Sequence, residues 1–210
     1  YVYDNGLMDG VDGGLFDPNG TTTRAQIVTI LYRLAGEPDI SDENLGYPYE
    51  DVRSAFWYTD AIYWARLTGI AGGYDNGNFG PDDAITREQM AAMLYRYAEY
   101  KGYDVTATGS LDSFTDKGSA SAWAQEAIKW AVGNGIMGGK ENNLLDPNGT
   151  ATRAEIAAML HRFVEKYGLK PVVTPTGTTG WTKPTISGNS ITSPTTGESS
   201  QFFGQDYLLM

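Results

Sequence analysis

Three arginines stand at the same point of a repeated pattern, and they are the residues of this chain best suited to hold an anion. Arg24, Arg87 and Arg153 each follow a threonine and open an apolar helical run. An arginine directly after a helix N-cap lies by the positive end of the helix, where its guanidinium and free backbone amides can share a carboxylate oxygen. The simpler interpretation is that the three arginines make structural salt bridges or lie on a solvated first turn.

Other side chains offer little chemistry. His161 is the only histidine, and by register it matches Tyr32 and Tyr95, which indicates a ring on a helix flank. The stretch 75–78 is similar to the start of a calcium loop, but the acidic ligand expected eleven residues beyond Asp75 is Thr86. No Ser/His/Asp set or phosphate loop stands out. We therefore expect no enzyme activity, no cofactor and no metal site.

Composition excludes several classes of partner. The net charge is −11 and the isoelectric point is about 4.4, whereas nucleic acids and anionic membranes attract basic proteins. Cysteine is absent, so disulfides and thiolate metal sites are excluded. No stretch approaches the ~18 apolar residues of a membrane span. Any anionic ligand must therefore be held by a local cluster, and we expect neither nucleic-acid binding nor membrane insertion.

The arginines mark three repeats, because they are 63 and 66 residues apart and the residues before them keep fixed distances. An apolar anchor lies eight residues before each arginine, a proline six before and a glycine eighteen before. In chain order the anchors are Phe16, Phe79 and Leu145, and the glycines are Gly6, Gly69 and Gly135. We divide the chain into repeat 1 (1–38, partial), repeat 2 (39–102), repeat 3 (103–168) and a tail (169–210).

Each repeat is predicted to be a helix, a loop and a second helix. The second helix begins with Thr-x-x-Gln/Glu, a capping box formed by Thr23 and Gln26, Thr86 and Gln89, and Thr152 and Glu155. The first helix is expected over 57–65 and 123–131, ending near a glycine. Trp57 and Trp123 begin the apolar stripe of these helices, which favours them as core residues.

Repeat 1 differs from the others, because Tyr1 aligns with Trp64 and Trp130 near the end of the first helix. Most of that helix would precede Tyr1. Because the chain opens at Tyr1 without a Met, we interpret it as a mature or trimmed fragment. The tail is rich in Pro, Thr, Ser and Gly, as a linker is, and it closes on an apolar segment.

The pattern Trp…Ala-Ile…Gly-Ile…Gly…Phe-x-Pro…Thr-Arg-Ala-Glu resembles the S-layer homology (SLH) repeat over about residues 1–168. The resemblance implies a mainly α fold, with three helix-loop-helix repeats in a pseudo-threefold arrangement around a central helical bundle. Such repeats attach exported bacterial proteins non-covalently to the cell wall, outside the cell. Their usual ligand is an anionic, often pyruvylated, secondary cell-wall polysaccharide, held in grooves between repeats.

Carried over to this chain, the resemblance implies that Arg24, Arg87 and Arg153 contact the anionic group, with help from Glu155. Trp57 and Trp123 could present their faces to a sugar ring. Only repeat 3 has the full Thr-Arg-Ala-Glu, since the first motif has Gln26 and the second has Glu88 and Gln89. We expect Glu88 to weaken anion binding beside Arg87. At most one or two grooves should bind the ligand, and repeat 3 is the copy best suited to do so.

Two further functions remain open. The repeats could serve self-assembly as a surface layer or filament, with the end of the tail completing repeat 1 in cis or in a neighbouring subunit. That homo-oligomer would use Phe202, Phe203, Tyr207, Leu208 and Met210. Alternatively, the chain could be the anchor of an enzyme whose catalytic domain lies outside it.

Overall fold

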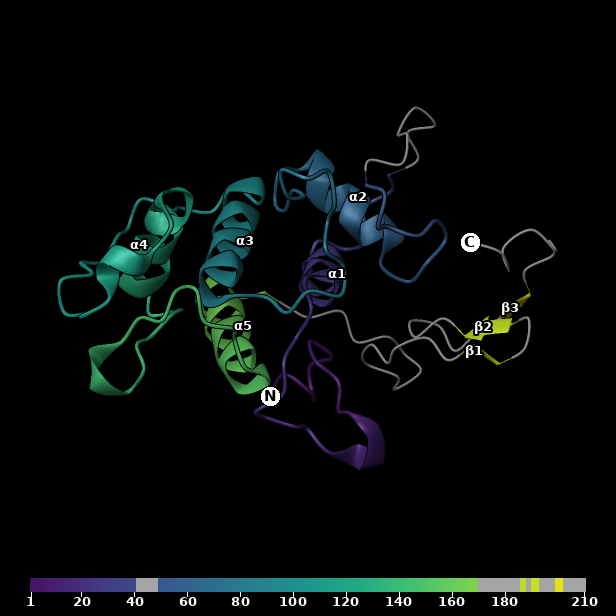
Figure 1. Ribbon diagram of the computed structural model, residues 1–210, viewed down its shortest axis with the longest axis horizontal. Coiled ribbons are helices and arrows are strands. Elements are labelled where there is room, and N and C mark those ends of the chain that lie inside the picture. Colours follow the sequence, from purple (N-terminus) through teal and green to yellow (C-terminus); the bar gives the residue numbers. More distant parts are fainter. Residues whose placement is uncertain (41–48, 170–185, 188–189, 193–198, 202–210) are drawn as a thin grey trace.

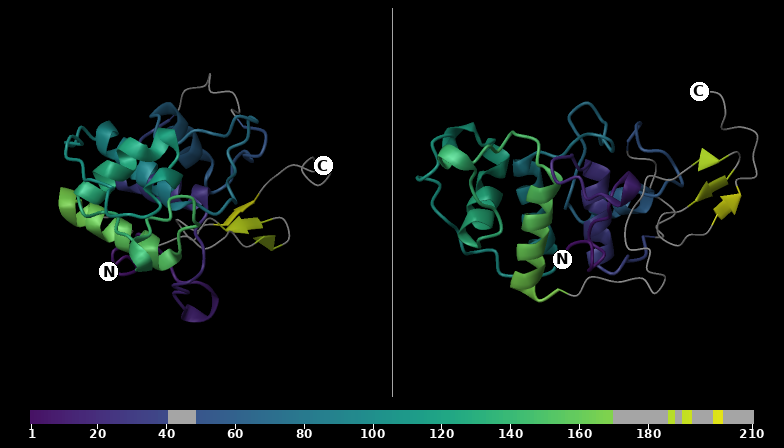
Figure 2. Two further views of the ribbon diagram at one scale, coloured as in Figure 1. Left: turned by 60° about the vertical axis from the view of Figure 1, so that its left-hand side comes forward. Right: turned by 90° about the horizontal axis from the view of Figure 1, so that it is seen from below.

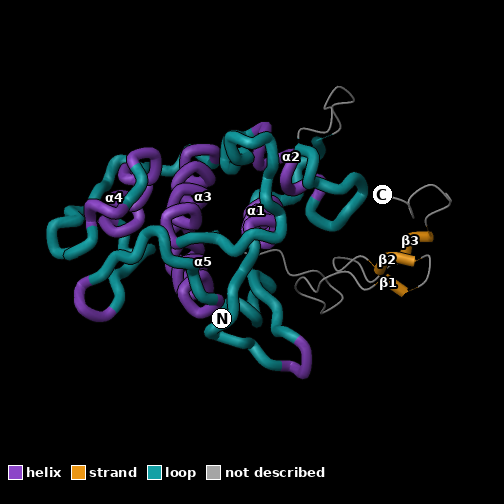
Figure 3. The backbone as a smooth tube through the Cα atoms, viewed as in Figure 1, coloured by secondary structure: helices purple, strands orange, loops and turns teal. Residues whose placement is uncertain are grey.

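The computed structural model describes residues 1–40, 49–169, 186–187, 190–192 and 199–201, and it is mainly α as predicted. Figures 1 and 3 show its elements and the long loops between them. The α-helices are α1 (Arg24–Leu34), α2 (Thr59–Leu67), α3 (Arg87–Tyr100), α4 (Gln125–Gly133) and α5 (Arg153–Tyr167). The 3-10 helices are η1 (Asp12–Gly14), η2 (Lys117–Ser119), η3 (Ala122–Ala124) and η4 (Glu141–Asn143).

Helices α1, α3 and α5 are the predicted second helices, and all three predicted capping boxes are confirmed. In α1 the backbone amide of Thr23 donates to Gln26 Oε1 at 2.7 Å, and the amide of Gln26 donates to Thr23 Oγ1 at 3.3 Å. The reciprocal pair recurs in the first turns of α3 and α5. Each box satisfies two amides that a helix start otherwise leaves without a partner, so these helices begin at the residue that the sequence predicts.

The first helices α2 and α4 end as predicted, at a left-handed glycine. Gly69 follows the C-cap of α2 with φ 73°, and Gly135 follows that of α4 with φ 68°. Both helices begin later than predicted, because the residues before Thr59 and Gln125 form turns and η3. Trp57 and Trp123 therefore lie outside the α-helices.

The core lies between the second helices, which gather in the middle of the molecule while α2 and α4 lie outside them (Figures 1 and 2). Trp64 and Trp130 are buried, and the rings of Tyr97 in α3 and Phe163 in α5 have centroids 5.8 Å apart. Burying one such side chain stabilises the fold by about 1.5–3 kcal/mol. The apolar stripes of the helices therefore meet in one shared core.

Ring contacts across the repeats confirm the predicted alignment of repeat 1. The ring centroid of Tyr32 in α1 lies 5.5 Å from that of Trp64 in α2. The ring centroid of Tyr95 in α3 likewise lies 5.5 Å from that of Trp130 in α4. The equivalent residue of α5 is His161, whose ring lies 3.9 Å from that of Tyr1. Tyr1 thus takes the place that Trp64 and Trp130 take in the other repeats.

In the tail, the structure describes only three short antiparallel strands, β1 (Ile186–Ser187), β2 (Ser190–Thr192) and β3 (Ser199–Gln201), in the order β1-β2-β3. Ile186 pairs with Ile191, and Ile191 with Ser200. The apolar end, residues 202–210, lies outside the described residues. Its proposed docking on repeat 1, like the boundaries of the four segments, stays a prediction.

Candidate functional site

Each motif arginine reaches from its own repeat into the loop of the next one. Arg24 of repeat 1 donates from Nε to the carbonyl oxygen of Phe79 at 3.0 Å and from Nη2 to that of Gly72 at 2.8 Å, both in repeat 2. These acceptors stand eight and fifteen residues before Arg87. The guanidinium therefore fastens the loop that leads to the next motif.

The same two hydrogen bonds recur at the other two arginines. Arg87 donates to Leu145 at 2.9 Å and Gly138 at 2.6 Å, and Arg153 donates to Phe16 at 2.9 Å and to Asp9. Repeat 1 thus binds repeat 2, repeat 2 binds repeat 3, and repeat 3 binds repeat 1. We name these contacts the 1–2, 2–3 and 3–1 junctions, after the repeat that gives the arginine and the repeat that gives the loop. This closed cycle favours the pseudo-threefold arrangement, which stays a prediction.

The first-turn amides that were expected to be free for an anion are occupied, so that expectation is wrong. The amide of Arg24 donates to the carbonyl of Asp83 at 2.9 Å, and that of Ala25 donates to Pro81 at 3.1 Å. Equivalent pairs are Arg87 with Gly149, Glu88 with Pro147, Arg153 with Gly20, and Ala154 with Pro18. The carbonyl of each motif proline therefore caps a helix of another repeat, and these first-turn amides are not free to bind a ligand.

Two aspartates that the sequence analysis missed hold the junction loops in shape. Asp51 accepts from the amides of Phe79 at 2.8 Å and Gly80 at 2.7 Å. Asp116 accepts in the same way from Leu145 and the residue after it, both at 2.7 Å. The available signal was an aromatic residue two positions before each aspartate and a tryptophan six or seven positions after it.

The three arginines are buried, with exposed fractions of 4%, 4% and 7%. Burial, opposed by nearby acids and tyrosines, lowers the pKa of Arg24, and burial opposed by Asp17 and Asp9 lowers that of Arg153. Aromatic rings cover two of the guanidinium groups. That of Arg24 lies 4.7 Å from the ring centre of Tyr74 and 4.8 Å from that of Phe79, and that of Arg153 lies 5.0 Å from the ring centre of Phe16. Each arginine is thus a structural residue first, and its contact with a ligand stays a prediction.

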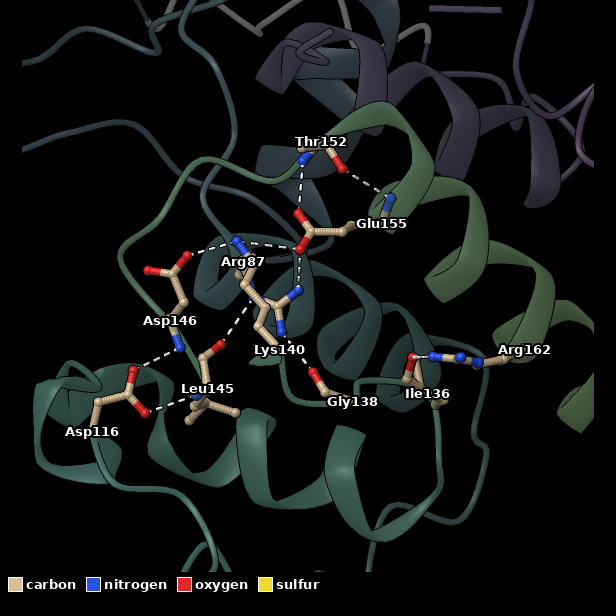
Figure 4. Close-up of polar contacts among 10 residues, drawn as sticks. All are labelled: Arg87, Asp116, Ile136, Gly138, Lys140, Leu145, Asp146, Thr152, Glu155 and Arg162. Atoms are coloured by element: carbon tan, nitrogen blue, oxygen red, sulfur yellow. Dashed lines mark hydrogen bonds and ion pairs between the residues drawn. The ribbon is translucent and has the colours of Figure 1, made fainter. Parts of the chain in front are cut away.

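The 2–3 junction contains a four-residue charge network (Figure 4). Arg87 Nη1 lies 3.0 Å from Glu155 Oε1, and Lys140 Nζ lies 3.3 Å from the same oxygen and 2.6 Å from Asp146. Burial opposes ionisation of Glu155, but the amide of Thr152 and the two cations lower its pKa overall. Burial likewise opposes the charge of Lys140, whose carboxylate partners raise its pKa overall.

This network changes the interpretation of the third motif. Glu155 was expected to act with Arg153 in one Thr-Arg-Ala-Glu unit, yet its carboxylate meets Arg87 of repeat 2. Glu88 accepts from the amide of Ser121 at 2.9 Å and from its hydroxyl at 2.8 Å, and its expected weakening of anion binding beside Arg87 stays a prediction. The acid that meets Arg87 therefore comes from the next repeat and not from its own motif.

The two tryptophans proposed as sugar platforms differ in exposure. Trp57 is half-buried and packs against the core, which agrees with its interpretation as a core residue. Trp123 is 53% exposed in η3, so its assignment to the core was wrong. The reason is that the chain forms a 3-10 turn before α4, which moves Trp123 off the apolar stripe. Tyr74, which the sequence analysis did not select, is 39% exposed beside Arg24.

Within the described ranges, no group of three or more His, Cys, Asp or Glu side chains is placed to hold a metal ion. In the same residues, no helix has the length and apolar character needed to cross a bilayer.

Comparison with known proteins identifies the repeats. The model of the S-layer homology domain matches residues 1–28, 48–91 and 113–157. Over 166 residues the chain is 38% identical to an amylopullulanase of Thermoanaerobacterium thermosulfurigenes, covering 77% of this chain and 8% of that protein. It is 30% identical to a cellulosome-anchoring protein of Acetivibrio thermocellus, covering 80% of this chain and 37% of that one. It is 31% identical to a surface-layer 125 kDa protein of Lysinibacillus sphaericus, covering 82% of this chain and 14% of that protein. The chain thus spans a minor part of each of these relatives.

Proposed function

The chain belongs to the S-layer homology domain family, and from that premise we propose that it anchors its protein at the bacterial cell surface by binding an anionic cell-wall polysaccharide. A pyruvylated secondary polysaccharide is the type of ligand we expect. The names of the relatives support a place outside the cell, because they include a cellulosome-anchoring protein and a surface-layer protein. The relatives named as enzymes match only over a small part of their length, which supports an anchoring role for the matched segment.

The observation that carries the proposal is the pairing of a guanidinium with an exposed ring at the 1–2 junction. Arg24 lies 4.7 Å from the ring centre of Tyr74, which is 39% exposed. A cation and an aromatic face side by side suit an anionic sugar, because the ring packs on the apolar face of the sugar while the guanidinium binds the carboxylate. Trp123 offers a second exposed ring.

A pull-down with purified cell-wall sacculi tests the proposal. Substituting the buried arginines would disturb the fold, so the informative variants are Tyr74→Ala and Trp123→Ala. Tyr100→Ala is the matched control, because Tyr100 is similarly exposed, at 43%, but lies at the end of α3 opposite Arg87. We expect binding to native sacculi, loss of binding when hydrofluoric acid has stripped the secondary polysaccharide, and at least fivefold weaker binding for Tyr74→Ala. Equal binding to stripped sacculi would overturn the proposal.

Self-assembly is the second candidate, favoured by the match to a surface-layer protein. We propose that residues 202–210 would then supply the contact between subunits. Light scattering of the full chain and of a form ending at residue 200 tests this, since a monomer in both cases would contradict it.

A further inference from the structure

We propose, resting on the function proposed above, that the fourth residue of each capping box decides which junctions accept an anionic group of the ligand. A glutamine leaves the outer amino group Nη1 of the facing arginine open, whereas a glutamate occupies it. The 1–2 and 3–1 junctions are then the open sites, and the 2–3 junction is closed.

At the 2–3 junction, every nitrogen of the Arg87 guanidinium has a partner. Nε and Nη2 donate to the carbonyls of Leu145 and Gly138, and Nη1 donates to Glu155 at 3.0 Å. An incoming carboxylate would have to displace Glu155 and then lie beside it. Like charges at such range repel strongly in a partly buried site.

Lys140 does not restore a free positive charge at this junction. Its ammonium group lies 2.6 Å from Asp146 and 3.3 Å from Glu155. With Arg87, the network holds two cations and two acids, so its formal charges cancel. The 2–3 junction is therefore satisfied without a ligand.

The 1–2 junction has the same backbone contacts but a neutral residue where Glu155 would lie. Gln89 stands there, and its side-chain oxygen accepts a hydrogen bond from the backbone amide of Thr86 at 3.2 Å. Among the described residues, Nη1 of Arg24 has no hydrogen bond and no ion pair, although the arginine is 96% buried. Asp51 and Asp83 attract Arg24 electrostatically from beyond ion-pair distance.

The 3–1 junction follows the 1–2 pattern. Arg153 uses Nε and Nη2 for the carbonyls of Phe16 and Asp9, and Nη1 has no partner within the described part of the chain. Gln26 stands in the position of Glu155, and Val11 in that of Lys140. Asp9 and Asp17 attract Arg153 without forming an ion pair. This junction is therefore open too.

Reciprocal substitutions between glutamine and glutamate test the proposal while keeping the fold. Both residues close a capping box in this chain, so Gln89→Glu, Gln26→Glu and Glu155→Gln each preserve the helix start. Gln125→Glu, at an exposed position of α4, controls for the added negative charge. The probe is a synthetic methyl hexoside carrying a pyruvate ketal, titrated by calorimetry into the full chain, with its neutral methyl ester as the control ligand.

We expect two sites in the wild type, one in Gln89→Glu and in Gln26→Glu, none in the double variant, and a third in Glu155→Gln. The lost sites should bind at least tenfold more weakly, and Gln125→Glu should match the wild type. An unchanged number of sites in the swap variants, or no binding of the probe by the wild type, overturns this inference. Binding to native but not to stripped sacculi would then still support the anchoring function, so the two proposals fail separately.

Discussion

The carboxylate of Glu155 lies 3.0 Å from Nη1 of Arg87, so the acid of the third capping box compensates the arginine of the second. Glu155 therefore has two tasks, the helix cap of its own repeat and the ion pair of its neighbour's junction. A pair of substitutions separates these tasks, because glutamine retains the cap and alanine removes both.

We predict that Glu155→Gln lowers the free energy of unfolding by about 1 kcal/mol, the typical worth of a partly exposed charge-assisted contact. Glu155→Ala should lower it by about 2 kcal/mol, since losing the cap adds about 1 kcal/mol. Urea denaturation of the three proteins measures both differences. Equal losses in the two variants would contradict the idea that Glu155 serves two separate contacts.

Arg153 closes the cycle of repeats, because its acceptors Phe16 and Asp9 lie 137 and 144 positions away in the sequence. Arg153→Ala leaves two carbonyls without their donor at a buried site, which should cost about 3 kcal/mol. Hydrogen exchange should become faster in residues 9–20 as well as in α5. Arg162→Ala is the control: Arg162 is exposed and its one hydrogen bond, to Ile136, is long at 3.4 Å, so its loss should cost under about 0.5 kcal/mol. Faster exchange confined to α5 would contradict closure of the cycle.

The sequence predicts the parts of the fold that depend on local side chains. Thr23 and Gln26 identify a helix start because a capping box has a fixed spacing and fixed chemistry. The alignment of Tyr1 with Trp64 also holds, since an invariant register predicts equivalent contacts. The helix starts of α2 and α4 were misplaced because neither has a side-chain cap to mark it.

The junctions were harder to predict, for a physical reason. The acceptors of each arginine are backbone carbonyls, such as that of Gly72, and every residue has one. Nothing in the residue types therefore marks them. The pairing of Glu155 with Arg87 crosses from one repeat to the next, whereas the motif places Glu155 two residues from Arg153. Only the arrangement of the repeats in space decides between those two partners.

Asp116 should stabilise the conformation of its loop, because each of its two carboxylate oxygens accepts a hydrogen bond from a backbone amide at 2.7 Å. Asn offers one acceptor, so Asp116→Asn leaves an amide unpaired and should cost about 1–3 kcal/mol. Asp112→Asn is the control, since the side chain of Asp112 is 83% exposed and makes surface contacts with Lys117 and Ser110. Thermal denaturation should show a clear loss for Asp116→Asn and almost none for Asp112→Asn.

The stabilisation that Asp116 gives should also depend on pH. Burial opposes ionisation of Asp116, but the amides of Leu145 and Asp146 lower its pKa below the usual value of 3.8. A carboxyl group with a lowered pKa in the folded state stabilises the protein above its unfolded pKa and loses that contribution as the pH falls through the folded value. The difference in stability between wild type and Asp116→Asn should therefore shrink in acid, below about pH 4. A constant difference from pH 7 to pH 2.5 would contradict the role of the carboxylate charge.

Asp9 should make the stability of the fold depend on pH in the direction opposite to Asp116. Burial raises the pKa of its carboxyl group to about 6, against the attraction of Arg33 and Arg153. Between the usual pKa of 3.8 and about 6, the folded protein holds a proton that the unfolded chain has released, so stability falls as the pH rises through this window. Asp9→Asn removes the titrating group but retains the backbone carbonyl that Arg153 binds. The variant should match the wild type near pH 4 and melt at a higher temperature at pH 7. Asp4→Asn, at a side chain 79% exposed, is the control and should follow the wild type throughout. A gap between wild type and Asp9→Asn that is as large at pH 4 as at pH 7 would show that burial of Asp9 does not penalise its charge.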